Sequence, residues 1–133
     1  MLSRVLFALL LLSTQAQAIE YPVEIIEYLD NNRVVAFVNE SDIKKSPQWD
    51  PPGEPPLSMA KAVSAVEQYI APAPINGETL IGIELKKIPR HQHQWHYLVK
   101  NKVQTEDQMV SHYYVVLMDG KVIPAIKEPE AYK

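Results

Sequence analysis

The sequence of 133 residues contains no cysteine and only four glycines. Without cysteine there can be no disulfide, so packing of apolar side chains must stabilise the fold. The missing thiol also removes the nucleophile of cysteine hydrolases and an acceptor for a lipid anchor. With so few glycines, the sequence has no glycine-rich loop of the kind that binds phosphate groups.

The sequence also lacks a run of charge of one sign. It has 13 Lys and Arg against 16 Asp and Glu, a formal net charge of −3, and these residues are interspersed. A surface that follows a nucleic-acid backbone needs clustered Lys and Arg. We therefore expect no nucleic-acid partner and interpret the charges as a mixed, solubilising surface.

Long apolar runs are absent except at the N-terminus. Arg4 precedes the apolar run Val5–Leu12, and small residues follow at Ala16-Gln17-Ala18. This is the layout of a cleavable secretory signal peptide. The run is shorter than the roughly 20 residues that a membrane-spanning helix needs. We therefore expect residues 1–18 to be removed, leaving a protein from Ile19 onward that is exported to the periplasm or beyond, without a stable membrane anchor.

Residues 19–45 are expected to form an N-terminal β-hairpin. Val23–Leu29 and Arg33–Val38 are rich in branched and aromatic residues, which favour strands. Asp30-Asn31-Asn32 lies between them, and asparagine tolerates the positive φ of a tight turn. The alternative is a short helix over Val23–Leu29, because its apolar residues also recur at helical spacing.

Residues 46–56 are expected to form an extended connector. Five prolines surround Trp49 in this segment. Proline fixes φ and lacks an N–H donor, so the segment can neither continue a helix nor join a central strand. Trp49 could present a recognition epitope to a partner or fold back onto the core. The large area that a tryptophan ring buries favours the second interpretation.

Residues 57–133 are expected to form a helix and an antiparallel sheet, which complete one globular domain with residues 19–45. Ser58 is a suitable N-cap for the helix. Behind it, apolar residues fall on one stripe at helical spacing: Met59, Ala62, Val63, Val66 and Ile70. Pro72 and Pro74 end the pattern.

Alternating or strongly β-prone segments then indicate three strands: Ile81–Lys86, Trp95–Lys100 and Met109–Met118. Asp119-Gly120 predicts a turn, after which Lys121–Ile126 can pair back, with Pro124 confining it to an edge. Such patterning with short loops predicts an antiparallel sheet with one solvent-exposed face. The expected fold class is α+β, with one long helix packed on a curled antiparallel β-sheet and an N-terminal β-hairpin.

An alanine-rich helix, an aromatic strand and a closing turn follow one another between Leu57 and Ile126. The residues concerned are Ala60, Ala62, Ala65, Trp95-His96-Tyr97-Leu98-Val99 and Met118-Asp119-Gly120-Lys121-Val122. In this order they resemble the small exported domains of the PepSY and cystatin-like type. The resemblance implies a non-catalytic binding, inhibitory or regulatory module of the cell envelope.

Histidines supply the one cluster that could hold a metal ion. If the hairpin turns near Gln104-Thr105, His96 and His112 become cross-strand neighbours with Cβ atoms about 4.5–5.5 Å apart. Such a pair could bind zinc or copper with a carboxylate or water. His91 and His93 would lie on the opposite face. Histidines that bind nothing are the favoured interpretation, and we expect no cofactor.

Residues with a catalytic pattern are sparse. The serines lack a glycine-rich nucleophile elbow. Ser111 and His112 are neighbours in a strand and so point to opposite faces. The sequence therefore predicts no enzymatic activity.

The expected function is an exported interaction module that binds a protein or peptide, with Trp49 and Tyr113 as candidate contact residues. The alternative is a metal- or small-ligand-binding protein that uses His96 and His112. Trp95 and Tyr97 share one strand face, which we interpret as core in preference to a binding surface, because large rings gain most from burial.

Overall fold

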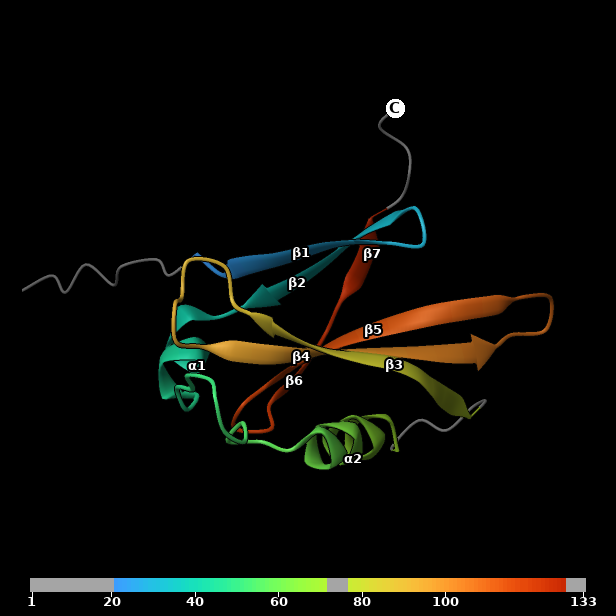
Figure 1. Ribbon diagram of the computed structural model, residues 1–133. Helices are drawn as coiled ribbons and strands as arrows, with labels where there is room; N and C mark the ends of the chain where they lie inside the picture. Colours follow the sequence, from blue (N-terminus) through green and yellow to red (C-terminus); the bar gives the residue numbers. More distant parts are fainter. Residues whose placement is uncertain (1–20, 72–76, 129–133) are drawn as a thin grey trace, which may run out of the picture.

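The computed structural model describes residues 21–71 and 77–128, so the expected signal peptide lies outside the described residues. The elements are β1 (Val23–Leu29), β2 (Asn32–Val38), α1 (Glu40–Lys45), α2 (Met59–Ile70), β3 (Glu78–Lys87), β4 (Trp95–Gln104), β5 (Met109–Leu117), β6 (Val122–Pro124) and β7 (Ile126–Glu128). The strands form two antiparallel sheets, with orders β1-β2-β7 and β3-β4-β5-β6 (Figure 1). Among the described helices, none has the length and apolar character to cross a membrane.

The N-terminal hairpin is confirmed. β1 and β2 pair in antiparallel register up to Leu29↔Asn32. Asp30 and Asn31 form the turn with φ values of 51° and 64°, the left-handed region that a two-residue turn of this kind requires. The alternative helix over β1 is therefore wrong.

The segment expected to be only a hairpin also contains α1. This six-residue helix has acidic residues in its first turn, basic residues in its last turn and one buried side chain, Ile43. Charges of these signs suit the two ends of a helix dipole. A helix with a single buried residue has no apolar periodicity, so the sequence pattern did not reveal it.

A helix after Ser58 is present as α2, with 12 residues, but it is one of two helices in the described part of the chain, so the expectation of one long helix is not confirmed. The Ser58 hydroxyl oxygen accepts a hydrogen bond from the Lys61 backbone N–H at 3.1 Å, so Ser58 is the N-cap. Ala62 and Val66 are buried against the second sheet, where they pack with Tyr97, Val99, Tyr114, Val116 and Met118. Small residues on this face let the helix lie close to the strands.

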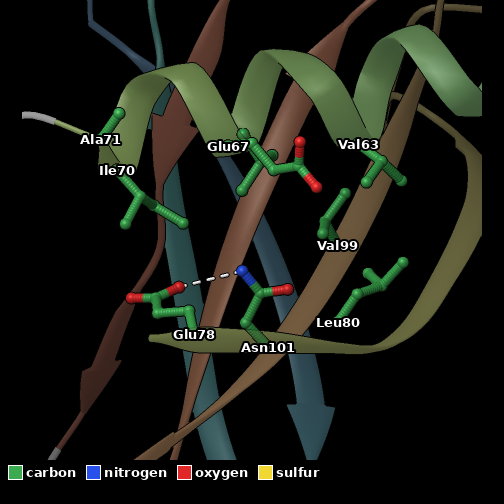
Figure 2. Close-up of a pocket in the computed structure, with 9 residues that line it drawn as sticks. Val63, Glu67, Ile70, Ala71, Glu78, Leu80, Val99 and Asn101 are labelled. Atoms are coloured by element: carbon green, nitrogen blue, oxygen red, sulfur yellow. Dashed lines mark hydrogen bonds between the residues drawn. The ribbon is translucent and has the colours of Figure 1, made fainter. Parts of the chain in front are cut away.

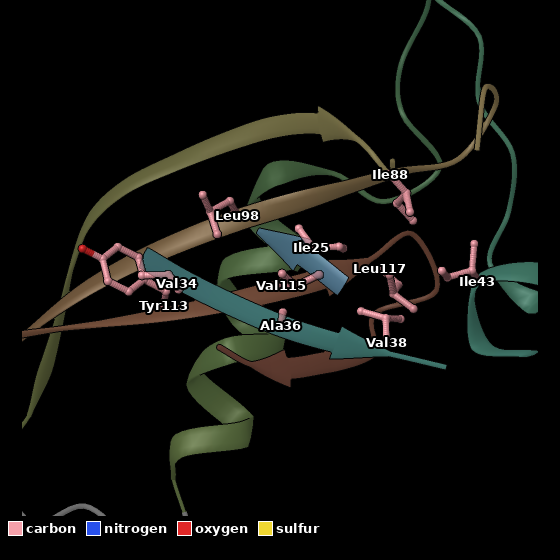
Figure 3. Close-up of a cluster of buried hydrophobic side chains, with 10 residues drawn as sticks. All are labelled: Ile25, Val34, Ala36, Val38, Ile43, Ile88, Leu98, Tyr113, Val115 and Leu117. Atoms are coloured by element: carbon pink, nitrogen blue, oxygen red, sulfur yellow. The ribbon is translucent and has the colours of Figure 1, made fainter. Parts of the chain in front are cut away.

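The prediction of a single curled sheet with one wet face is wrong. The first sheet covers the face of β4 and β5 opposite α2 (Figure 1). The core between the two sheets contains Ile25, Val34, Ala36, Val38, Ile43, Ile88, Leu98, Tyr113, Val115 and Leu117 (Figure 3). The molecule therefore has three layers: the first sheet, the second sheet and α2.

The last strands connect the two sheets. β6 pairs with β5 through Val115↔Ile123 and is the edge strand of its sheet, which confirms the position expected from Pro124. After Ala125, whose N–H donates to the Tyr113 carbonyl at 2.8 Å, the chain passes to the first sheet. There β7 pairs with β2, a contact that the sequence pattern did not predict.

Leu117→Ala tests the core between the sheets. Leu117 is 0 % exposed, and truncating a fully buried leucine costs about 2–5 kcal/mol. We expect urea unfolding to report a loss of this size, and a loss of under about 1 kcal/mol for Met109→Ala, which lies on the same strand and is 55 % exposed. Equal losses for the two variants would contradict the three-layer packing.

Candidate functional site

The expected histidine pair is not brought together. In the β4–β5 hairpin His96 lies opposite Leu117, and His112 lies opposite Asn101. The turn lies at residues 105–108, later than expected, where the Thr105 N–H donates to the Gln108 carbonyl at 2.9 Å. The partner of His96 is Leu117, an odd number of residues away from the expected partner His112. The two histidines therefore point to opposite faces of the sheet.

No group of three His, Cys, Asp or Glu side chains suited to a metal ion occurs in the part of the chain that the structure describes. His91 Nε2 lies 2.8 Å from a carboxylate oxygen of Glu40, which raises the pKa of His91. His93 Nδ1 lies 2.6 Å from a carboxylate oxygen of Asp50. These contacts link the loop after β3 to α1 and to the connector.

His96 is a buried residue with one unsatisfied nitrogen. It is 1 % exposed, and its Nδ1 has no hydrogen-bond partner within residues 21–71 and 77–128. Burial lowers the pKa of His96 to about 4, because the charged imidazolium loses its hydration. His96 is therefore neutral at pH 7, and it belongs to the packed interior.

His96 should make the fold sensitive to acid. Its pKa is about 4 in the folded protein and 6.5 in the unfolded chain, so the unfolded chain binds a proton first as the pH falls. Stability from the neutral imidazole is complete above pH 6.5 and is lost progressively toward pH 4. We expect His96→Leu to reduce the difference in unfolding free energy between pH 7 and pH 4.5 by about 2–3 kcal/mol.

The measurement is urea unfolding at both pH values, with His93→Gln as the control because its side chain is 52 % exposed. The control should keep the acid sensitivity of the unchanged protein. If His96→Leu keeps it as well, His96 is not the group responsible.

Trp49 folds back onto the protein, as the favoured interpretation expected. Its ring packs edge-to-face on Trp95 with 4.9 Å between centroids. The Trp49 N–H donates to the His93 carbonyl at 2.8 Å, and Trp95 Nε1 donates to the Trp49 carbonyl at 2.9 Å. Tyr97 is 3 % exposed, so the interpretation of the aromatic strand face as core is confirmed for this residue.

Tyr113 is not at the surface, so the expected contact role for it is wrong. It is 1 % exposed between the two sheets, and its hydroxyl donates to Asp30 at 2.9 Å. Hydrogen bonds from Lys100 and Tyr113 hold the pKa of Asp30 below its usual value. The turn of the first hairpin is thereby tied to the second sheet.

A hollow of about 180 Å³ lies between α2 and the β3–β4 edge of the second sheet (Figure 2). Its walls are mostly apolar. The lining residues are Val63, Val66, Glu67, Ile70, Ala71, Glu78, Leu80, Val99 and Asn101. We call this space the α2–β3 pocket.

Glu78 is the polar centre of the pocket wall. Its carboxylate accepts hydrogen bonds from Asn101 Nδ2 at 2.9 Å, from His112 Nδ1 at 2.7 Å and from the Tyr114 hydroxyl at 2.8 Å. The Glu78 side chain is 10 % exposed. Burial alone would raise its pKa, but the three donors outweigh burial and lower it. Glu78 is therefore a fixed negative charge at neutral pH.

Asn101 and Glu67 add further acceptors to the pocket. Asn101 is 5 % exposed. While its Nδ2 binds Glu78, its carbonyl oxygen points the other way, toward the space between Val99 and Leu80 (Figure 2). No hydrogen bond to this oxygen is made by the described residues. Glu67 brings a second carboxylate from α2, and neither Lys nor Arg is among the described lining residues.

Sequence reasoning missed this site. Glu78, Asn101, His112 and Tyr114 come from three strands and share one face only in the observed register. A correct register would have aligned Asn101 with His112, and that polar pair on the mostly apolar face toward α2 was the available signal.

Comparisons with protein families, with curated proteins and with solved structures found no match for this chain.

Glu78→Gln tests the buried charge. At pH 7 the three donors would face a weaker, neutral acceptor, so we expect a loss of about 1–3 kcal/mol of unfolding free energy. Because the folded pKa of Glu78 is lowered from 4.5, this stabilisation is complete above pH 4.5 and is lost as the pH falls through the folded pKa. The gap between the unchanged protein and the variant should therefore close in acid.

Chemical unfolding from pH 7 to pH 3 measures this gap. Glu84→Gln is the matched control, since Glu84 lies on the same strand with a side chain that is 60 % exposed. A gap that stays constant with pH would show that Glu78 is not held as an anion.

Proposed function

We propose that this protein is an exported, non-enzymatic binding module that takes a protein or peptide partner in the α2–β3 pocket. The observation that carries the proposal is the pocket itself, in which apolar walls surround a few fixed polar groups. This combination is typical of binding sites, where the apolar area supplies affinity and the polar groups supply orientation.

The size of the pocket favours one side chain of a larger partner. Small-molecule and cofactor sites usually have volumes of roughly 300–1,000 Å³, whereas this pocket encloses about 180 Å³. A single inserted side chain with apolar area is therefore a better fit than a whole cofactor. Such an anchor is the usual centre of a protein–protein or protein–peptide contact.

The polar groups of the pocket support binding in preference to catalysis. A general acid or base works best when its pKa lies near the working pH. The pKa of Glu78 is lowered and its oxygens are occupied by three donors, while burial and the Glu78 charge raise the pKa of Tyr114. Both groups therefore keep one protonation state around neutral pH.

Export rests on the sequence of residues 1–18, which has the charged start, apolar run and small terminal residues of a signal peptide. The resemblance of Leu57 to Ile126 to PepSY and cystatin-like domains supports a regulatory or inhibitory role in the cell envelope. The proposal therefore includes export and a regulatory or inhibitory role.

A tryptophan placed at the pocket tests the location of the site. Ala71 lines the pocket and is exposed at the end of α2, so Ala71→Trp should fill its mouth. Ala60 is exposed near the other end of α2 and does not line the pocket, so Ala60→Trp is the matched control. Circular dichroism would establish that both variants fold.

A displayed library of random peptides is the probe. We expect the unchanged protein and Ala60→Trp to enrich the same peptides, and Ala71→Trp to bind them at least roughly tenfold more weakly, because an occupied pocket loses its anchor. Peptides that bind all three proteins equally, or no enriched peptide at all, would overturn the proposal.

A further inference from the structure

We propose that the occupant of the α2–β3 pocket is a lysine or arginine side chain, presented by an extended peptide that adds to the outer edge of β3. This inference rests on the proposed function and specifies the partner. It is carried by three features: two carboxylates with neither lysine nor arginine among the described lining residues, apolar walls beside them and an exposed strand edge.

The charge of the pocket selects a cation. Glu67 and Glu78 place two carboxylates in the lining, and no described lining residue carries a positive charge. Among the described residues, Glu78 accepts hydrogen bonds from an amide, an imidazole and a phenol, and none of these donors is a lysine or arginine. A basic side chain would meet an attractive field, and an acidic one would be repelled.

Asn101 gives a second, independent reason to expect a donor. The residue is 5 % exposed, and its carbonyl oxygen faces the pocket without a partner among the described residues. Figure 2 shows this oxygen directed away from Glu78. An apolar occupant would leave the oxygen dry and unpaired, whereas an ammonium or guanidinium group would donate to it.

The apolar walls suit the stem of such a side chain. Ile70 from α2, Leu80 from β3 and Val99 from β4 lie beside the acceptors. Lysine and arginine carry three or four methylene groups that pack on apolar surface while the charged end reaches polar groups. The pocket therefore complements both parts of a basic side chain.

The exposed edge of β3 explains why the partner should be extended. β3 has ten residues and pairs only with β4 in the described sheet, so its other edge is unpaired there. Leu80 and Ile81 are each 42 % exposed. An unpaired strand edge offers backbone donors and acceptors to an added strand. Alternate side chains of that strand would then point to the face where Glu78 and Leu80 line the pocket.

Synthetic peptides test the side-chain preference. The probe is the fluorescently labelled, blocked peptide Thr-Val-Thr-Z-Thr-Val-Thr, in which Z is lysine, arginine, norleucine or glutamate. Fluorescence anisotropy would measure Kd for the unchanged protein, Glu67→Gln and the matched control Glu84→Gln. Glu84 is an exposed carboxylate on β3 that does not line the pocket.

We expect the lysine and arginine peptides to bind at least roughly tenfold more tightly than the norleucine peptide, and the glutamate peptide to bind most weakly. Glu67→Gln should weaken the lysine peptide by roughly three- to tenfold, and Glu84→Gln by less than about twofold. Binding of the lysine peptide should weaken between low and high salt, because a charge pair is screened.

Pentylamine separates a peptide from a free amine. It carries an ammonium group on an apolar chain but has no backbone to pair with β3. We expect it to displace the lysine peptide only at a concentration at least about a hundredfold above the Kd of that peptide. Displacement at a concentration equal to this Kd would overturn strand addition.

The remaining outcomes distinguish the two proposals. If the norleucine peptide binds as tightly as the lysine peptide and Ala71→Trp abolishes both, the basic preference is overturned while the pocket remains the site. If the lysine peptide binds the Ala71→Trp variant with the same Kd as the unchanged protein, the pocket is not the site, and both proposals fail. If none of the peptides binds, the basic extended partner is overturned, and the library selection decides the proposed function.

Discussion

The central constraint in this structure is that β5 must be covered on both faces. Six consecutive residues, Tyr113 to Met118, are all buried. Neighbouring residues of a strand point to opposite sides, so one covering layer cannot bury them all. The first sheet covers Tyr113, Val115 and Leu117, and α2 covers the alternate set. The three layers follow from this one strand.

The site is a consequence of the same arrangement. α2 packs on the second sheet through its small residues, and its Tyr69 ring meets Tyr114 edge-to-face at 6.0 Å between centroids. Toward the β3 edge the space beneath the helix is not filled, and this space is the α2–β3 pocket. A carboxylate in such a place loses hydration, so it is retained only with donors. Asn101, His112 and Tyr114 supply them to Glu78.

Local features of the fold could be predicted from the sequence, and long-range pairings could not. The turn at Asp30-Asn31 and the cap at Ser58 depend on nearby residues, and both were predicted. The position of the β4–β5 turn fixes a register, and an error there moved His112 to the wrong neighbour and hid the Glu78 cluster. The β2–β7 pairing joins segments about 90 residues apart, for which a single sequence holds no local signal.

Methyl-selective nuclear Overhauser spectroscopy tests the three-layer account most directly. Val115 and Val116 are adjacent in β5 but belong to different cores. We expect cross-peaks from Val115 to Ala36 of the first sheet and from Val116 to Ala62 of α2, and none from Val115 to Ala62 or from Val116 to Ala36. Cross-peaks from both valines to the same layer, or none from Val115 to the first sheet, would contradict the three-layer account.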